Sequence, residues 1–467
     1  MKNLISKYIG KSDSFRRNAI IMSSGAGLRV LISIGLYPIV TRIFTKEQFG
    51  GLGLYLAVVG IIALAGTSLY PSGLVIPKFK RDFYALVKLS ISLAIIVVIV
   101  TSFTIFFFKD TFIYIFKLET LGNLIYLIPF GIALTCITDI SLNWNVRNKD
   151  FKKNAFSGVA SGGSLKIMNI SHGLVFGPTL IGLIISNWIS VIIAISTLGV
   201  KKMIIGLRVL RRVSLKETIV IGKTYKKYPL NLLPGNLLNK YTTDLPIYML
   251  TAYFSPAITG AFVLADNIMK IPLNVIGNSL GLVFLQRANE LYLTSPKSMS
   301  DFAYETNKKM LKVGVLSFGF LFGFGDLIFA IVFGKKWAIA GTFARILSTY
   351  FIFKLISGPM AKVFRVVGKE QYSLYVSCVL AVVRFVGIYL GVISNDYMLA
   401  ITYFTIANII GYLVTYVFLF KACNLPILQS FVETITIVIV SYGLFFLLRK
   451  GFDNIIDTSI FLKSSIE

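Results

Sequence analysis

Apolar stretches of about twenty residues recur along this chain of 467 residues, from Asn18 to its C-terminal region. Each is long enough to cross the ~30 Å hydrocarbon core of a bilayer as an α-helix. Only 14% of the residues are charged and 56% are hydrophobic, whereas about a quarter of the residues in a soluble domain are charged. The sequence therefore predicts an all-α polytopic membrane protein.

The spans group into two sets of six, about twelve in all. We expect an N-terminal six-helix lobe at 1–200, a basic cytoplasmic linker at 201–229 and a C-terminal six-helix lobe at 230–420. The remaining segment, 421–467, contains an apolar stretch, Leu425–Leu448, that is long enough for a thirteenth span. Arg449 and Lys450 would then lie on the side of the membrane that basic residues avoid, so the sequence leaves this span open.

The net charge of +27 comes from Lys and Arg residues that gather in alternate loops between the spans. A nucleic-acid-binding protein would instead carry them on one domain or one face. The positive-inside rule places these loops and the N-terminus in the cytoplasm. We therefore expect a multi-pass membrane protein with a cytoplasmic N-terminus that contacts lipid and binds no nucleic acid.

A short repeat relates the two predicted lobes. Thr41, Phe44, Thr45 and Gly50 recur with identical spacing as Thr251, Phe254, Ser255 and Gly260. Repeats of six spans run parallel, and in transporters built this way the substrate site lies between the repeats.

Basic residues near the middle of predicted spans are the candidate binding residues, because a charge at the bilayer centre costs ~2.5–3.5 kcal/mol on insertion scales. The six candidates for a substrate-binding cationic cavity are Arg29, Lys166, Lys240, Lys270, Lys354 and Arg384. Some of them have an acidic residue four positions away, in the pairs Lys240 with Asp244 and Asp266 with Lys270, so mutual neutralisation is the alternative. Arg29, Lys166 and Arg384 have no acid on their own helix and need another helix, water or an anionic substrate.

One predicted span, Ala257–Leu285, carries a polar stripe. Asp266, Lys270, Asn274, Asn278 and Gly281 follow roughly one face of a regular helix. Such a face lines a cavity or forms a polar seam between packed helices.

Four residues are candidates for ion coupling, because they titrate and lie within predicted spans: Asp244, Asp266, Asp326 and His172. Histidine titrates near neutral pH and suits a proton relay. A single histidine near the turn at Gly177 and Pro178 equally fits a polar residue at a helix end.

No motif for catalysis, a cofactor or a metal is found. The sequence lacks a P-loop, a GxSxG elbow, a HExxH motif and a CxxC pair, and its three cysteines are scattered. The predicted outer loops are too short to hold the catalytic groups of a membrane glycosyltransferase or polymerase. We expect a transporter, not an enzyme.

Several motifs are similar to one known family. The hairpin Pro38–Gly50 reads PIVTRIFTKEQFG, and the middle of the chain carries Tyr228-Pro229, Leu245-Pro246, Gly260-Ala261-Phe262, Pro272, Gly277 and Arg287 to Glu290. Phe333 to Trp337, Gly341, Arg345-Ile346-Leu347 and Gly358-Pro359 follow. With these motifs the chain resembles, from end to end, the Wzx-type polysaccharide flippases of the multidrug/oligosaccharidyl-lipid/polysaccharide exporter superfamily.

The resemblance implies two six-helix lobes around a central cationic cavity that works by alternating access. It implies that undecaprenyl-pyrophosphate-linked oligosaccharide, such as an O-antigen or capsule repeat unit, is moved to the outer leaflet of a bacterial cytoplasmic (inner) membrane for a polymerase and chain-length machinery. A drug/cation antiporter of the same superfamily is the main alternative, although its cavity would be expected to be rich in acids and aromatic residues. A membrane glycosyltransferase or polymerase and a membrane scaffold are the others.

Overall fold

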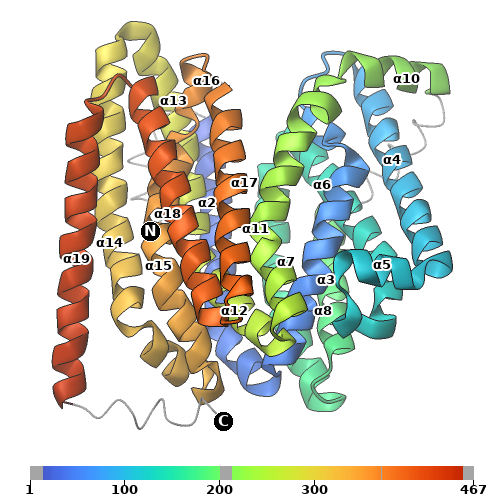
Figure 1. Cartoon of the computed structure of the whole chain (residues 1–467). Coiled ribbons are helices and arrows are strands. Elements are labelled where there is room, and N and C mark those ends of the chain that lie inside the picture. The colour runs from blue at the N-terminus through green and yellow to red at the C-terminus, as the bar shows by residue number, and fades with distance from the viewer. Residues whose placement is uncertain (1–13, 200–212, 370, 456–467) are drawn as a thin grey trace, which may run out of the picture. The chain divides into compact units, whose positions relative to one another are not determined.

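The computed structural model describes residues 14–199, 213–369 and 371–455, which fold almost entirely into helices (Figure 1). Within these ranges, 10 helices are long and apolar enough to cross a membrane. The prediction of an all-α polytopic membrane protein is confirmed.

The chain divides into two compact units, and the division does not follow the order of the sequence. Unit 1 comprises Met1–Ile43 and Leu54–Leu237, and unit 2 comprises Phe44–Gly53 and Leu238–Glu467. A ten-residue piece from the first part of the chain therefore belongs to the second unit. We call it the Phe44–Gly53 segment.

Unit 1 is built on long helices joined by short turns. They are α2 (Ser14–Ile43), most of α3 (Lys46–Thr67), α4 (Lys80–Phe107), α5 (Lys109–Phe116), α6 (Ile128–Arg147), α7 (Phe151–Val175), α8 (Leu180–Thr197) and α10 (Leu215–Thr224), with short helices η1 (Tyr70–Gly73), η2 (Glu119–Leu127) and η3 (Tyr228–Leu232). α2 packs on α7, and α7 packs on α8.

Polar side chains at two places fix the packing of unit 1. Trp188 Nε1 donates a hydrogen bond of 2.9 Å to the hydroxyl of Tyr55, which itself donates to the carbonyl oxygen of Leu127. α10 begins with a capping box in which Ser214 and Glu217 bond each other's backbone N–H groups. The hydrogen bond from the Ser214 backbone, with Arg81 close by, lowers the pKa of Glu217.

Unit 2 contains the later helices and the last part of α11. They are α11 (Leu233–Tyr253), α12 (Pro256–Pro272), η4 (Leu273–Gly277), α13 (Asn278–Thr294), α14 (Pro296–Phe333), η5 (Lys335–Trp337), α15 (Ala338–Met360), α16 (Val363–Val366), α17 (Gln371–Ile393), α18 (Tyr397–Ala422) and α19 (Ile427–Ile455). α15 forms the centre, because α12, α14 and α18 all pack against it.

The helix α19 covers the apolar segment whose span the sequence left open. It is continuous over Ile427–Ile455, satisfies the length and hydropathy of a membrane span, and packs along α14 (Figure 1). Of the two basic residues that counted against a span, Arg449 is buried at 6% exposure and Lys450 is exposed.

Three helices at the positions of predicted spans are not among the 10 helices that are long and apolar enough to cross a membrane: α7, α11 and α12. These are the helices that carry Lys166, the pair Lys240 with Asp244, and the pair Asp266 with Lys270. The hydropathy of these three helices is low because they carry these charged residues. Helices buried among other helices can carry such residues, because their polar faces avoid lipid.

The expected polar stripe on α12 and α13 crosses a change of helix type. Pro272 lacks a backbone N–H and ends α12, and the next five residues form the π-helix η4. The stripe therefore does not lie on one regular α-helix. Its position on a cavity or on a seam between helices stays a prediction.

The Phe44–Gly53 segment is tightly held within unit 2. A Cβ built on Gly50 would lie 2.0 Å from the carbonyl oxygen of Pro256, and one built on Gly260 would lie 1.8 Å from the carbonyl oxygen of Lys46. α3 and α12 thus touch backbone to backbone, with the two repeat glycines in equivalent roles. The Phe49 ring also packs edge-on against buried Trp337 at 5.1 Å.

The repeat found in the sequence has the same local structure at both copies. Thr45 caps α3 in a reciprocal pair with Gln48, and the Ser255 hydroxyl accepts a hydrogen bond of 3.2 Å from the N–H of Ile258 at the start of α12. Cap and glycine therefore recur together at each helix start.

Candidate functional site

Two basic side chains lie on the contact between α2 and α7 in unit 1. Arg29 runs along α7, where only glycine leaves room: a Cβ on Gly162 would lie 2.6 Å from its Cγ. Lys166, one turn further along α7, is 7% exposed, and its Nζ lies 3.4 Å from the centre of the Tyr37 ring. The aromatic face stabilises the ammonium by a cation–π interaction.

The two charges of this pair have the same sign. Arg29 acts electrostatically on Lys166, and no salt bridge to either residue occurs in the described part of unit 1. Arg29 remains exposed while Lys166 is buried. The arrangement leaves a local excess of positive charge that an anion would neutralise.

Asn169, which the sequence did not single out, lies one turn beyond Lys166 on the buried face of α7. It is 3% exposed, and its Oδ1 has no hydrogen-bond partner among the described residues. The signal was its spacing of three residues from Lys166, which places both on one side of the helix.

His172 is not part of this pair. Its ring lies against Gly182 of α8, where a Cβ would meet the ring atoms at 2.2 Å, and next to the Phe176 ring. A buried Nδ1 without a described partner is its only unusual feature. Its role in ion coupling stays a prediction.

The two predicted Lys–Asp pairs form in unit 2. Lys240 makes a salt bridge with Asp244 on α11, and Lys270 makes one with Asp266 on α12. In both pairs the acid is the buried partner, at 6% and 9% exposure for Asp244 and Asp266. The lysines are only partly buried.

Arg384 of α17 is buried at 3% exposure and is held by neutral groups. Its Nε donates 2.9 Å to Asn408 Oδ1, its Nη1 donates 3.3 Å to Thr243 Oγ1, and its Nη2 donates 3.4 Å to the Tyr412 hydroxyl. Hydrogen bonds of this kind orient the guanidinium without cancelling its charge.

Lys354 of α15 lies over aromatic rings, with Nζ 4.8 Å from the centre of Phe351 and 5.9 Å from that of Tyr350. It is in the electrostatic field of Lys270, Asp266, Arg384 and Asp244. Four helices thus bring their charges together.

We call this group the unit 2 charge cluster. It comprises Lys240, Asp244, Asp266, Lys270, Lys354 and Arg384. Four basic and two acidic side chains give it a formal charge of +2. The stacked rings of Tyr350 and Tyr412 adjoin it, 6.3 Å apart. An anionic group is the ligand that such a cluster suits.

The tyrosines and Asn408 of this site were missed from the sequence. Asn408 and Tyr412 lie four residues apart on α18, which is a spacing that a search for polar pairs on apolar helices would have found. Tyr248, four residues after Asp244, has a buried hydroxyl without a described partner.

Asp326 lies in a different environment. Its carboxylate binds Arg345 Nη1 at 3.0 Å and Arg449 Nη1 at 3.0 Å, and it also accepts from the Leu327 N–H. Because α14, α15 and α19 each contribute one of the three charged residues, the group joins these helices. Asp326 is not part of the unit 2 charge cluster. Its salt bridges with two arginines favour a structural role over ion exchange.

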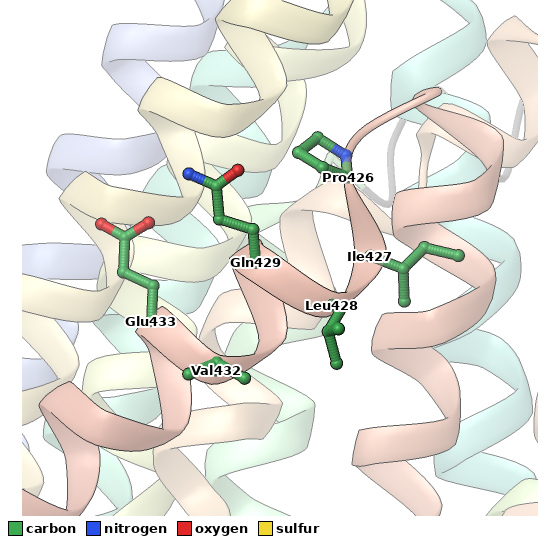
Figure 2. A pocket seen from close by; sticks show the side chains of 6 residues that line it. All are labelled: Pro426, Ile427, Leu428, Gln429, Val432 and Glu433. Atoms are coloured by element: carbon green, nitrogen blue, oxygen red, sulfur yellow. The ribbon is translucent and has the colours of Figure 1, made fainter.

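A groove of about 700 Å³ lies along the first turns of α19 (Figure 2). Its lining consists of Pro426, Ile427, Leu428, Gln429, Val432 and Glu433. Its one charged residue, Glu433, is already bonded by Lys308 and by the hydroxyl of Tyr304. The groove is therefore no site for an anion.

Comparison with known proteins gives likenesses at low identity. No family model matches the chain. The succinoglycan biosynthesis transport protein ExoT of Rhizobium meliloti (strain 1021) is 19% identical over 338 residues, which are 69% of this chain and 65% of that protein. The match thus spans less than two thirds of that curated relative.

Solved structures match over nearly the whole chain. The lipid II flippase MurJ in an inward closed conformation has a TM-score of 0.70 at 12% identity, covering 96% of this chain and 99% of that one. An inward-facing MATE family multidrug resistance transporter of the MOP superfamily has a TM-score of 0.66 at 14% identity, covering 90% and 98%. A MOP superfamily transporter from Pyrococcus furiosus, described by the reverse polarity of its binding pocket, has a TM-score of 0.60 at 13% identity, covering 87% and 95%. The resemblance inferred from the sequence is confirmed.

Proposed function

We propose that this chain, whose fold is that of the multidrug/oligosaccharidyl-lipid/polysaccharide exporter superfamily, is a polysaccharide flippase. Its substrate is an undecaprenyl-pyrophosphate-linked oligosaccharide, which it moves from the cytoplasmic to the outer leaflet by alternating access. The observation that carries the proposal is the unit 2 charge cluster, with more basic than acidic side chains on α11, α12, α15 and α17. A pyrophosphate headgroup needs cations to replace its hydration there.

Unit 1 supports the same proposal through Arg29 and Lys166, whose charges have no described acidic partner. Both units thus offer positive charge on their own helices. The polyprenyl chain of the substrate is apolar and can remain in lipid while only the headgroup and glycan enter protein. The relative named for succinoglycan biosynthesis transport fits a polysaccharide substrate.

The protein lies, in this proposal, in a bacterial cytoplasmic membrane with its N-terminus in the cytoplasm. The basic residues of the alternate loops support this orientation through the positive-inside rule. The flipped product would pass to a polymerase and its chain-length machinery. The chain itself catalyses no bond change.

A drug/cation antiporter is the second candidate, because MATE transporters share the fold. A cation substrate is expected to need a site rich in both acids and aromatic rings. The acids of the unit 2 charge cluster are outnumbered by bases and each is already paired with a lysine. The sign of the charge therefore favours the flippase.

The test uses a deletion strain of the source bacterium. Lipid-linked oligosaccharides are extracted, and their leaflet is determined by access of a membrane-impermeant reagent. Accumulation of a complete undecaprenyl-pyrophosphate-linked repeat unit on the cytoplasmic side supports the proposal. Normal flipping of incomplete intermediates would instead make this protein an enzyme of assembly.

Variants connect this phenotype to the site. Lys166→Met and Arg384→Met should abolish glycan export at unchanged protein level, because each removes a buried charge aimed at the headgroup. Lys223→Met on exposed α10 is the matched control and should export normally. Full export by both site variants would refute the assignment of the site.

A further inference from the structure

The two Lys–Asp pairs of unit 2 share an asymmetry. The side chains of Asp244 and Asp266 are 9% and 12% exposed, whereas those of Lys240 and Lys270 are 37% and 34% exposed. In each pair the carboxylate is the more buried partner, and the lysine is the one that a ligand can reach first.

We propose that Asp244 and Asp266 are resident counter-anions, which Lys240 and Lys270 exchange for the diphosphate group of the substrate. The inference rests on the proposed function and adds a role for the acids in it. While the site is empty, each aspartate neutralises its lysine. When a diphosphate arrives, the lysines turn to it, and on its departure they return to the aspartates.

The geometry allows this exchange without movement of the backbone. Each pair is spaced four residues apart on one helix, so both partners keep their places when the salt bridge opens. A lysine carries three N–H donors on a flexible stem and can be shared between two anions during the exchange. Arg384 differs, because three neutral side chains fix its guanidinium.

The two acids lower the net charge of the cluster, and this is the role that we assign to them. Without them, four basic side chains would face the ligand; with them, the formal charge is +2. A diphosphate esterified at both ends keeps one ionised oxygen on each phosphorus, because esterification removes the second ionisation that phosphate monoesters have near pH 6. The cluster and such a ligand therefore balance. Excess attraction would hold the headgroup and slow its release.

The alternative is that the acids only position the lysines. The two roles predict opposite effects when the acids are neutralised. If Asp244 and Asp266 compete with the ligand, their loss strengthens binding. If they orient the lysines, their loss weakens it.

The experiment measures binding of the undecaprenyl-pyrophosphate-linked oligosaccharide extracted from the deletion strain to the full-length protein in nanodiscs, with flipping of the same lipid measured in proteoliposomes. Asp244→Asn and Asp266→Asn should each bind at least roughly tenfold tighter, as expected for removal of a like charge within several ångströms of the ligand. Both variants should also flip more slowly. Glu433→Gln, which removes an acid of unit 2 outside the cluster, is the control and should match the unmodified protein.

A second variant tests the inference independently, in case the asparagine variants do not fold. The exchange of partners in Lys240→Asp/Asp244→Lys keeps the salt bridge and the net charge but turns the acid outward. It should bind the lipid at least roughly tenfold more weakly. Unchanged binding by this variant would overturn the inference.

The outcomes separate this inference from the proposed function. If the unmodified protein binds the lipid and the asparagine variants bind it equally or more weakly, the aspartates are positioning residues and only the exchange is wrong. If the unmodified protein does not bind this lipid-linked oligosaccharide, the proposed function fails and the exchange fails with it.

Discussion

Replacing Gly50 or Gly260 with alanine should force α3 and α12 apart. The new methyl group would lie 2.0 Å from the Pro256 carbonyl oxygen in the first case and 1.8 Å from the Lys46 carbonyl oxygen in the second, against 3.4 Å for ordinary contact. The obstructing atoms are backbone, so no side chain can turn away, and one helix must shift by more than an ångström. Overpacking of this kind costs about 1–3 kcal/mol.

Trp337 offers a direct signal for this displacement. Its buried indole packs on Phe49, the residue next to Gly50 in the Phe44–Gly53 segment. In detergent-solubilised protein, both alanine variants should unfold at lower temperature and show a red-shifted tryptophan emission. The double variant should lose little more than the single ones, because one displacement relieves both clashes.

Gly443→Ala is the control for these variants. It lies in α19 of the same unit, and a Cβ there would meet nothing within 4 Å. This variant should be as stable as the unmodified protein or slightly more so, because alanine favours a helix over glycine. If the Gly50 and Gly260 variants behave like this control, the close approach of the two helices is refuted.

Asp326→Asn should destabilise the protein by about 3–5 kcal/mol in thermal unfolding, because Arg345 and Arg449 would lose their shared acid; a change under 1 kcal/mol would contradict the buried network. Arg384→Lys keeps the charge but loses the planar fork, so export in the complemented deletion strain should fall roughly ten- to a hundredfold, and normal export would show that charge alone suffices. Alkaline phosphatase fused after residue 467 should be active if α19 spans the membrane and the N-terminus is cytoplasmic, whereas a fusion after Cys423 should be inactive. The reverse pattern would place the protein in the opposite orientation, whereas inactivity of both fusions would show that α19 does not span the membrane.

Spacing along one helix made part of the site predictable. The salt bridges of Lys240 with Asp244 and of Lys270 with Asp266 follow from positions four residues apart, and both form. The caps at Thr45 and Ser255 were marked by the repeat. The apolar spans followed from length and hydropathy, because the bilayer sets both.

Contacts between distant helices could not be predicted in this way. Nothing in a single sequence joins Arg449 to Asp326, 123 residues earlier, or Arg384 to Thr243, 141 residues earlier. The basic end of α19 therefore counted against a segment that the structure shows as one continuous helix of membrane length. The π-helix after Pro272 was also not predicted, because the regular period of the sequence does not include it.

The Phe44–Gly53 segment imposes an order on the biosynthesis of this protein. Its backbone partner on α12 lies roughly 200 residues later in the chain, which takes a ribosome roughly 10–40 s to add at 5–20 residues per second. During this interval Phe44 and Phe49, both buried in the finished protein, have no partner within unit 2. The nascent helix α3 must therefore be inserted early and held by lipid or an insertase until α12 arrives to receive it.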